Sequence, residues 1–264
     1  MPSSVSQFFQ NSTVQFAEGV ISFAIFRYVL LAGGMFFVLY IWQHTFFAKH
    51  KIQPKETTND KVKWEITTGV KSIFIYAGVL VLVEILGEYG INQVYFQLDK
   101  LGIVWAIASF FLLFIFHETY FYWTHRLIHR PQLMHKIHKV HHVSNNITPF
   151  AAVAVHPVEA LVEYSYLLVF SFIFPVSIYV LLAESLIAFF FNLLWHSGYE
   201  FFPKGWVTHP FFGWFNTSTH HNLHHQRPVG NYGLYTNFWD RMCNTNRKEY
   251  ASYFNEVKGR LEKE

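Results

Sequence analysis

Residues 28–47 read YVLLAGGMFFVLYIWQHTFF, a run of twenty mostly apolar residues. Wound as an α-helix, such a run has a length of about 30 Å, which matches the hydrocarbon core of a bilayer. Arg27 stands just before it, where a long basic side chain can reach the lipid headgroups. The run therefore predicts a transmembrane helix.

Further apolar stretches predict a whole bundle of such helices. Residues 73–91 and 101–123 each have the length of a span, and 52% of the chain is hydrophobic while 14% is charged. Residues 160–195 are also apolar, with Pro175 near their middle. As a helix they would be about 54 Å long, slightly short of two crossings. We expect a cramped hairpin turning near Pro175, in an all-α membrane bundle of about four or five spans.

The distribution of lysine and arginine predicts the orientation of this bundle. The first twenty residues contain neither, so they read as a short tail before a span and not as a secretory signal. Residues 49–71 carry six lysines, residues 92–100 carry one, and the segment after residue 123 is basic again. Because cytoplasmic loops are the basic ones, we expect the N-terminus outside and the segment after residue 123 in the cytoplasm.

Composition limits the ligands that the chain can bind. The net charge is +3 and the basic residues are spread out, so there is no stripe of the kind that binds nucleic acid. A single cysteine, Cys243, excludes an internal disulfide and a metal site built from several thiolates. Sixteen histidines, in contrast, permit a metal site built on imidazole.

The histidines recur at the spacing of one helix face. His125 and His129 lie four residues apart, and residues 138–142 and 221–225 each place three histidines at positions i, i+3 and i+4. Two further candidates flank the apolar hairpin. Eight to ten convergent imidazoles are too many for one ion, so we expect a cap that holds two metals. The candidate ligands are His125, His129, His138, His141, His142, His156, His196, His221, His224 and His225.

Spacing alone leaves the metal open, because imidazole binds zinc, copper, iron and nickel. The lack of a Glu-x-x-His pair argues against the soluble ferritin-like arrangement. A bis-histidine haem would need facing pairs inside the bilayer, whereas these groups lie just past the ends of the spans. A transporter would place ligands in mid-span, where little is found beyond Glu84, Glu88 and Glu184. Isolated histidines are expected to be packing or surface residues: His44, His50, His117, His135 and His209.

Five motifs together resemble a known family: HETYFYWTHRLIH (117–129), HKVHH (138–142), TPFAAVAVHPVEA (148–160), HHNLHH (220–225) and NYGLYTNFWDRM (231–242). In order and spacing they are similar to the membrane-bound fatty acid hydroxylase and sterol desaturase superfamily over about residues 101–246, and the histidine-proline element favours its sterol-desaturase-like branch. The resemblance implies two iron ions in a histidine-lined cytosolic cap beneath about four transmembrane helices. It also implies hydroxylation or desaturation of a sterol-like or fatty acyl lipid with dioxygen and two electrons.

The resemblance also assigns residues by position. The histidine pair and the two triplets match the family's three histidine boxes, and His196 matches an additional ligand after the hairpin. His156 belongs to an element shared mainly by the sterol-type branch. Some members have a histidine where Asn192 stands, which implies one ligand fewer, or a water, at one metal. From residue type and closeness to the boxes, we expect four acceptors for imidazole N–H groups: Glu118, Glu159, Asn231 and Asp240.

These observations divide the chain into a tail with two spans (1–100), a catalytic domain (101–246) and a solvated charged tail (247–264). The absence of a fused cytochrome domain implies a separate electron donor, either a b-type cytochrome or a ferredoxin-like protein with its reductase. The C-terminal EKE shows no clear retrieval signal, which favours a bacterial inner membrane over the endoplasmic reticulum. The alternative function is a histidine-rich membrane metal-binding or transport protein without redox turnover, and no residue separates hydroxylation from desaturation.

Overall fold

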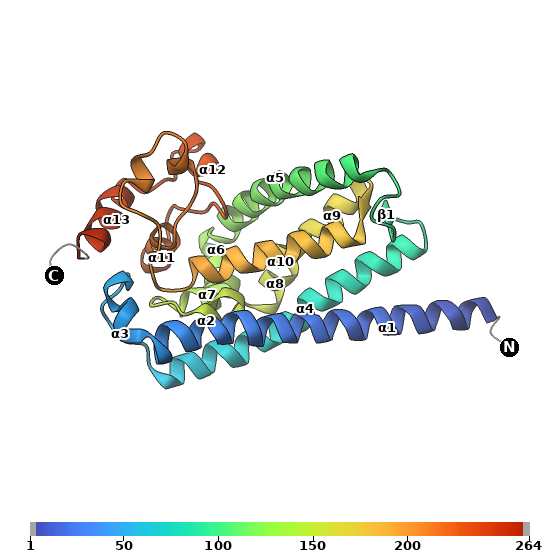
Figure 1. Cartoon of the computed structure of the whole chain (residues 1–264), viewed down its shortest axis with the longest axis horizontal. Coiled ribbons are helices and arrows are strands. Elements are labelled where there is room, and N and C mark those ends of the chain that lie inside the picture. Colours follow the sequence, from blue (N-terminus) through green and yellow to red (C-terminus); the bar gives the residue numbers. More distant parts are fainter. Residues whose placement is uncertain (1–3, 261–264) are drawn as a thin grey trace.

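The computed structural model describes residues 4–260 of the chain, and the side chains of residues 12–260. Long helices lie side by side in one bundle, and short helices gather at one end of it (Figure 1). The long elements are α1 (Ser4–Arg27), continued by η1 (Tyr28–Gly33), α2 (Gly34–Phe36) and η2 (Phe37–Trp42), and then α4 (Asn59–Glu88), α5 (Ile103–Ile128) and α10 (Ile178–Trp195).

Within the part of the chain that the structure describes, four helices are long and apolar enough to cross a membrane, which confirms the predicted helical membrane bundle. Their outer surfaces carry exposed apolar side chains such as Phe26, Val29, Phe111 and Ile115, as expected of surfaces that face lipid. Inside the bundle, Val83, Leu113, Phe170 and Leu181 are fully buried and join α4, α5, the short helix α9 (Tyr166–Ile173) and α10 in one core. The four stretches are residues 12–42, 59–88, 103–128 and 178–195.

The first span begins earlier than predicted. The helix starts at Ser4, so the residues expected to form a tail belong to it, and its apolar part runs from Ser12. Apolar residues before Arg27, such as Val20 and Ala24, pack into the core and carry the helix past the expected start. Arg27 therefore lies midway along the span with only 6% of its surface exposed. Its predicted place at the membrane edge was wrong.

Residues 160–195 form the predicted hairpin, which turns at Pro175. Its first arm is broken at Ser165 into two short helices, so it is not one of the four apolar spans. Trp105 donates its indole N–H to the carbonyl of Pro175 at 2.9 Å, and a short parallel strand pair joins the turn to the link between α4 and α5. The elements are α8 (Pro157–Tyr164), α9 (Tyr166–Ile173), β1 (Val94–Tyr95) and β2 (Val176–Ser177).

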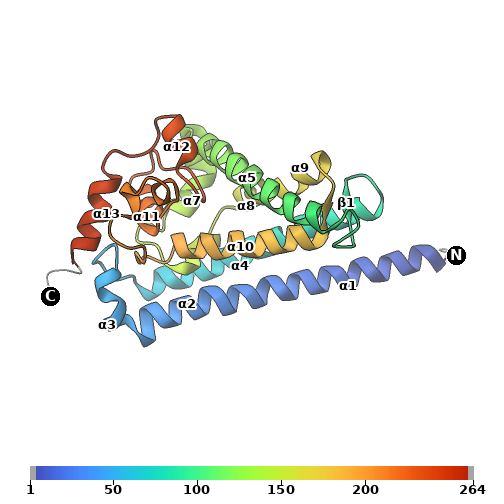
Figure 2. The ribbon, with the colours of Figure 1, turned by 45° about the horizontal axis from the view of Figure 1, so that its top comes forward.

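The short elements form a cap at the end of the bundle opposite the N-terminus (Figure 2). The last helix packs here with Phe254 and Val257 fully buried, so residues 250–259 are not the solvated tail that was expected. The backbone of Lys51 forms an isolated antiparallel β-bridge with Tyr199 at this end. This contact places the start of the lysine-rich segment, residues 49–71, beside the cap. The cap elements are α3 (His44–Phe47), η3 (Ala48–His50), α6 (Pro131–Leu133), η4 (Met134–His138), α7 (Lys139–His142), η5 (Pro149–Val153), η6 (Trp206–Thr208), η7 (Phe212–Trp214), α11 (Ser218–Gln226), α12 (Phe238–Met242) and α13 (Tyr250–Gly259).

Candidate metal centre

Four parts of the chain deliver the clustered histidines to the cap. His125 lies in the last turn of α5 and His129 follows as its C-cap, while His196 is the C-cap of α10. The two triplets lie on η4 with α7 and on α11. The membrane helices thus carry ligand candidates in their last turns, next to the cap, and the short cap helices bring the rest to meet them.

Local sequence explains where these short helices begin. Arg130 is extended and Pro131 takes the first position of α6, so the chain turns sharply after α5 and starts a new helix. Thr217 caps α11, because its hydroxyl accepts the backbone N–H of His220 at 3.3 Å. Both devices place a histidine triplet within about three helical turns of a fixed starting point.

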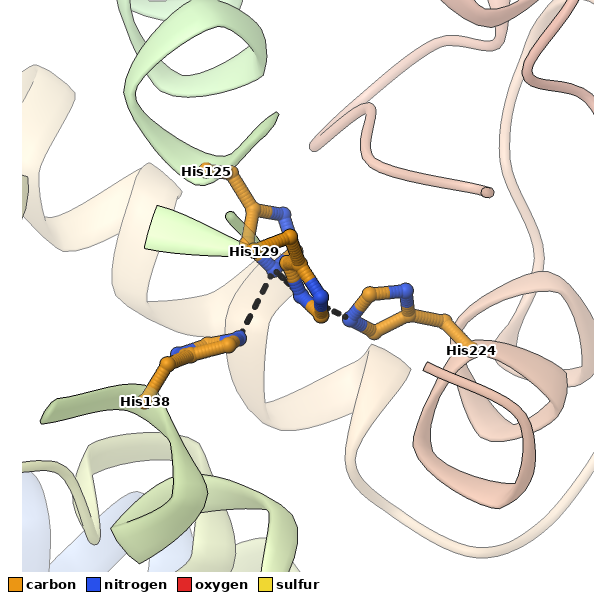
Figure 3. A group of neighbouring side chains, drawn as sticks. All are labelled: His125, His129, His138 and His224. Atoms are coloured by element: carbon orange, nitrogen blue, oxygen red, sulfur yellow. Dashed lines mark hydrogen bonds between the residues drawn. The ribbon is translucent and has the colours of Figure 1, made fainter. Parts of the chain in front are cut away.

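The rings form two groups of four, and in each group the candidate ligand nitrogens all lie within 4.8 Å of one another. The first, here called the α5 group, is drawn in Figure 3, where the rings turn their nitrogens toward a common centre. Within it, the Nε2 atom of His125 lies 3.2 Å from that of His138, and the Nε2 atom of His129 lies 3.1 Å from that of His224. The α5 group consists of His125, His129, His138 and His224.

The second group, here called the α10 group, has the same character. The Nε2 atom of His196 lies 2.9 Å from that of His221 and 3.3 Å from that of His141. His225 completes the group at 3.1 Å from His221, and all four rings are buried. The α10 group consists of His141, His196, His221 and His225.

Hydrogen bonds on the far sides of the rings show what these nitrogens can do. His125 donates from Nδ1 to the carbonyl of Tyr232 at 2.9 Å, and His138 donates from Nδ1 to Glu159 at 2.5 Å. In a neutral imidazole the other nitrogen then has a lone pair and no hydrogen. The close Nε2 atoms of His125 and His138 are therefore two acceptors that cannot bond each other. A cation between them removes this conflict. The Nδ1 atoms of His224 and His196 lie 2.8 Å from the carbonyls of Gly230 and Asn192, so their Nε2 atoms also present lone pairs to the centres of their groups.

The histidine rings that lie outside the membrane spans are buried, and burial keeps them in the neutral form, which is the form that binds metal. Desolvation lowers the pKa of His196 to about 4, and the pKa of His142 to about 3 with a smaller contribution from neighbouring His125. Desolvation and the surrounding rings hold the pKa of His221 and His225 well below the usual range. Metal ions need no proton release from such rings near neutral pH.

His142 lies between the two groups. Its Nε2 atom is 3.1 Å from that of His138, and its ring centre is 4.8 Å from the rings of both His224 and His225. It therefore contacts members of each group without belonging to the tight set of either.

His156 is the predicted ligand that the structure does not bring to the centre. Its Nδ1 atom accepts the backbone N–H of Val158 at 3.2 Å and caps α8. It belongs to neither group of four among the described residues. The histidine-proline element thus starts a helix, and that helix places Glu159 against His138, so we remove His156 from the ligand set.

Three of the four expected imidazole acceptors have other partners. Glu118 accepts the backbone N–H and the hydroxyl of Thr236, and the side chain of Asn231 binds the backbone of His220 and Arg247. Asp240 accepts the backbone N–H groups of residues 232 and 233, and lies 3.9 Å from the imidazole of His220, which is in neither group. Glu159 is the carboxylate that reaches a ring of the α5 group.

Sequence reasoning missed that backbone carbonyls take the place of those carboxylates. Gly230 and Tyr232 supply two of them from a turn in which Gly230 and Asn231 have positive φ angles of 88° and 58°. Asp240 fixes this turn by accepting from the backbone at 2.9 and 2.7 Å. The succession of glycine and asparagine predicts a turn but not which carbonyls face histidines. His117, expected to be a packing residue, is buried against Glu184.

The comparisons with known proteins agree with this geometry. The family model described as fatty acid hydroxylase matches residues 110–245. The chain is 29% identical to a Delta(7)-sterol 5(6)-desaturase of Gibberella zeae over 85% of this chain and 66% of that protein. It is 28% identical to the lathosterol oxidase of Homo sapiens and 30% identical to that of Rattus norvegicus, each over 69% of this chain and 60% of the relative. No solved structure matches it.

These relatives bear on two of the sequence-based expectations. They are sterol-modifying enzymes by name, which supports the lipid-oxidising interpretation and not the metal-transport alternative. They come from fungi and mammals, so they do not favour the bacterial inner membrane. The chain spans between 60% and 66% of their length.

Proposed function

This chain belongs to the fatty acid hydroxylase family, and on that premise we propose that it is a membrane-bound di-iron oxygenase. It would hydroxylate or desaturate a lipid, sterol-like or fatty acyl, with dioxygen and two electrons. The observation that carries the proposal is the pair of four-histidine groups in the cap at one end of a membrane bundle.

The donor set fits two iron ions. Each group offers four nitrogen atoms. The hydrogen bonds at Nδ1 fix the tautomers of four rings, so their Nε2 lone pairs point toward the centres of the groups: His125, His138, His196 and His224. Neutral imidazole suits iron among other divalent metals, and the groups contain no thiolate or carboxylate. We propose that the α5 group holds one ion, the α10 group holds the other, and His142 contacts the space between them.

Bound there, two iron ions would activate dioxygen and supply the oxidising power that an unactivated C–H bond requires. The chain's own residues hold and orient the rings of the ligand histidines. Glu159 fixes the ring of His138 and increases its basicity, and the carbonyls of residues 192, 230 and 232 fix three more rings. Burial of the α10 group keeps bulk water away from the reacting carbon.

Two partners follow from the proposal. The substrate is a bilayer lipid, because the cap lies at the ends of α5 and α10 and a lipid can reach it without crossing water. Electrons come from a separate donor, a b-type cytochrome or a ferredoxin-like protein with its reductase. We place the cap on the cytoplasmic side, in keeping with the lysines of residues 49–71.

The test is oxygen consumption by the purified protein loaded with iron. We expect uptake that requires iron, a reductant and a lipid extract, and a lipid product that has gained one oxygen atom or lost two hydrogens by mass spectrometry. Iron-loaded protein that never couples oxygen uptake to a lipid product would refute the proposal. Iron flux into liposomes without such a product would instead support transport.

A further inference from the structure

A chain of oxidisable aromatic rings leads from the α5 group to the surface of the protein. Tyr232 stands at its inner end, with its ring centre 4.9 Å from that of His129. The same ring centre lies 5.7 Å from the rings of His125 and His224. Among the described residues, Tyr232 is the one tyrosine or tryptophan whose ring contacts a member of either histidine group. Electron transfer between the metals and an aromatic side chain would therefore begin at this ring.

Three further rings continue the path outward. The ring centre of Tyr122 lies 6.3 Å from that of Tyr232, and the ring of Trp239 lies 6.0 Å from that of Tyr122. Trp123 completes the path at 5.7 Å from Trp239, with 47% of its surface exposed. The last turns of α5 supply Tyr122 and Trp123, and α12, which lies beside this end of α5, supplies Trp239 (Figure 2). Contacts between neighbouring rings thus connect a buried metal group to solvent.

The identity of these rings points to a role beyond packing. Thirty phenylalanines outnumber the fifteen tyrosines and eight tryptophans of the chain together. Phenylalanine fills space and stacks as tyrosine and tryptophan do. It is very hard to oxidise, however, whereas tyrosine and tryptophan lose an electron far more readily. None of the four rings on the path is a phenylalanine, which favours electron transfer over packing alone.

Tyr122 also has the proton acceptors that its oxidation requires. A tyrosine that loses an electron loses its phenolic proton as well, because the cation that forms is strongly acidic. The hydroxyl of Tyr122 lies 2.9 Å from Oγ1 of Thr245, which in turn donates to Asp240 at 2.7 Å. Arg126 donates to the same phenol oxygen at 3.2 Å, and its positive charge opposes retention of the proton. Tyr122 can therefore pass its proton to Thr245 while Thr245 passes its own to Asp240.

We propose that Tyr232, Tyr122, Trp239 and Trp123 form an escape path, which carries an oxidising equivalent from the metals to the surface when no lipid is bound. The inference rests on the proposed function, because the oxidant is the metal centre after reaction with dioxygen. Such a centre is strong enough to attack a C–H bond, and without a substrate it would attack the protein. The escape path protects the ligand histidines from this reaction.

The transfer balances in electrons and protons. One electron passes from Tyr122 through the ring of Tyr232 to the metals, and one proton reaches Asp240 along the hydrogen bonds given above. An electron from Trp239 and Trp123 then restores Tyr122, and the proton returns from Asp240. A one-electron reductant in solution, such as ascorbate, replaces the electron at Trp123. The net reaction moves one electron from the reductant to the metals.

The first test oxidises the protein from its surface and needs no iron. The full chain in detergent is loaded with zinc, which binds imidazole and has no redox chemistry. Every protein in the series carries Cys243→Ser, because the thiol lies next to Tyr122 and would compete for the oxidising equivalent. A laser flash on a ruthenium tris-bipyridine complex with a quencher oxidises exposed tryptophan, and transient absorption follows the radicals. We expect the tryptophanyl signal to decay while a tyrosyl signal appears.

Variants locate the transfer on the path. Trp123→Phe changes an exposed ring and Trp239→Phe a partly buried one, and each should lose most of the tyrosyl signal. Thr245→Val removes the proton acceptor, so the tyrosyl signal should be lost while the tryptophanyl signal persists. Trp42→Phe, an exposed tryptophan of the first span, is the matched control and should keep the tyrosyl signal. A parent protein without a tyrosyl signal, or path variants with an undiminished one, would overturn the inference.

The iron-loaded protein provides a separate arm. With dioxygen and ascorbate but without lipid, Trp239→Phe should accumulate oxygen atoms on Tyr232 and on the ligand histidines, whereas the wild type should not. Peptide mass spectrometry measures this difference, and equal oxidation of the two proteins would contradict the protective role. Protein that binds no iron would refute the proposed function, while radical transfer in the zinc-loaded series would still decide whether the path exists.

Discussion

The α5 group and the α10 group each offer four imidazole nitrogens, but different contacts hold their rings in place. In the α5 group, Nδ1 of His125, His138 and His224 each has an oxygen partner, and one of these partners is a carboxylate. In the α10 group, Nδ1 of His225 has no hydrogen-bond partner among the described residues, and Nδ1 of His196 lies near a backbone carbonyl and not a carboxylate. Hydrogen bonds on the far side of a ligand ring raise metal affinity. We therefore expect the α5 group to bind its ion more tightly.

The largest effect on metal content and activity should come from two single substitutions, each of which removes one ligand from one group. His138→Ala and His225→Ala should each lose one of two iron ions, because the affected ion then has three protein ligands. Each variant should also lose all lipid oxidation, because the pair of ions is broken. Elemental analysis and product assays measure both. His135→Ala, an exposed histidine in the same segment as His138, is the control and should keep both ions. Loss of both ions from either ligand variant would show that the groups are not separate sites.

The next largest effect should come from acidification, which should release the metal ions of the two groups at different pH values. Above the usual histidine pKa of 6.5, His196 is neutral in both the folded and the unfolded chain; between 6.5 and about 4, the unfolded chain binds a proton that the buried ring does not. Stability of the metal-free protein should therefore fall as the pH falls through this window. Metal release should occur in two steps, with the α10 ion leaving at the higher pH. Release of both ions in one step would contradict the difference between the groups.

A smaller effect is expected from Glu159→Gln, which keeps the shape of the side chain but removes the charge behind His138. Metal affinity of the α5 group should fall by about 10–100-fold while that of the α10 group stays unchanged. Competition with a chelator measures both constants. Glu163→Gln, one turn further along α8, is the matched control, because Glu163 contacts Tyr76 and not a histidine. An equal loss in both groups would mean that Glu159 acts on the fold as a whole.

The smallest effect should come from Asp240→Asn. Asp240 touches no ring of either group but holds the turn whose carbonyls face His125 and His224. Metal affinity should fall by less than about tenfold, in the α5 group alone, and unfolding should become easier by about 1–3 kcal/mol, since buried hydrogen bonds are weakened. Denaturant unfolding of the metal-free protein, beside a chelator titration, gives both values. A change confined to the α10 group would contradict the assignment.

The sequence predicted which histidines cluster better than it predicted the hydrogen-bond partners that fix their rings. Helical spacing is a local property, so the positions of His221, His224 and His225 along the chain are enough to assign them to one helix face. The partner of His138 and the carbonyls behind His125 and His224 depend on which distant segments meet, and no spacing encodes that. The excluded candidate, His156, shows the reverse error, because a helix cap and a metal ligand look alike in sequence.

The bundle shows the same limit. Hydropathy predicted the spans and the hairpin at Pro175, because apolar length is read directly from the residues. It placed Arg27 at a membrane edge because charged residues usually end a span. Only the packing of α1 against α4, together with the hydrogen bond from Arg27 to Ser185 of α10, shows this cation inside the bundle.

The central claim is that two separate all-nitrogen sites lie side by side in the cap. Anaerobic titration of the metal-free protein with iron(II), followed by X-ray absorption spectroscopy, tests it most directly. We predict two ions bound per chain, the first more tightly than the second, with nitrogen as the protein donor at both. A single ion per chain, or coordination by sulfur or by several carboxylates, would contradict it.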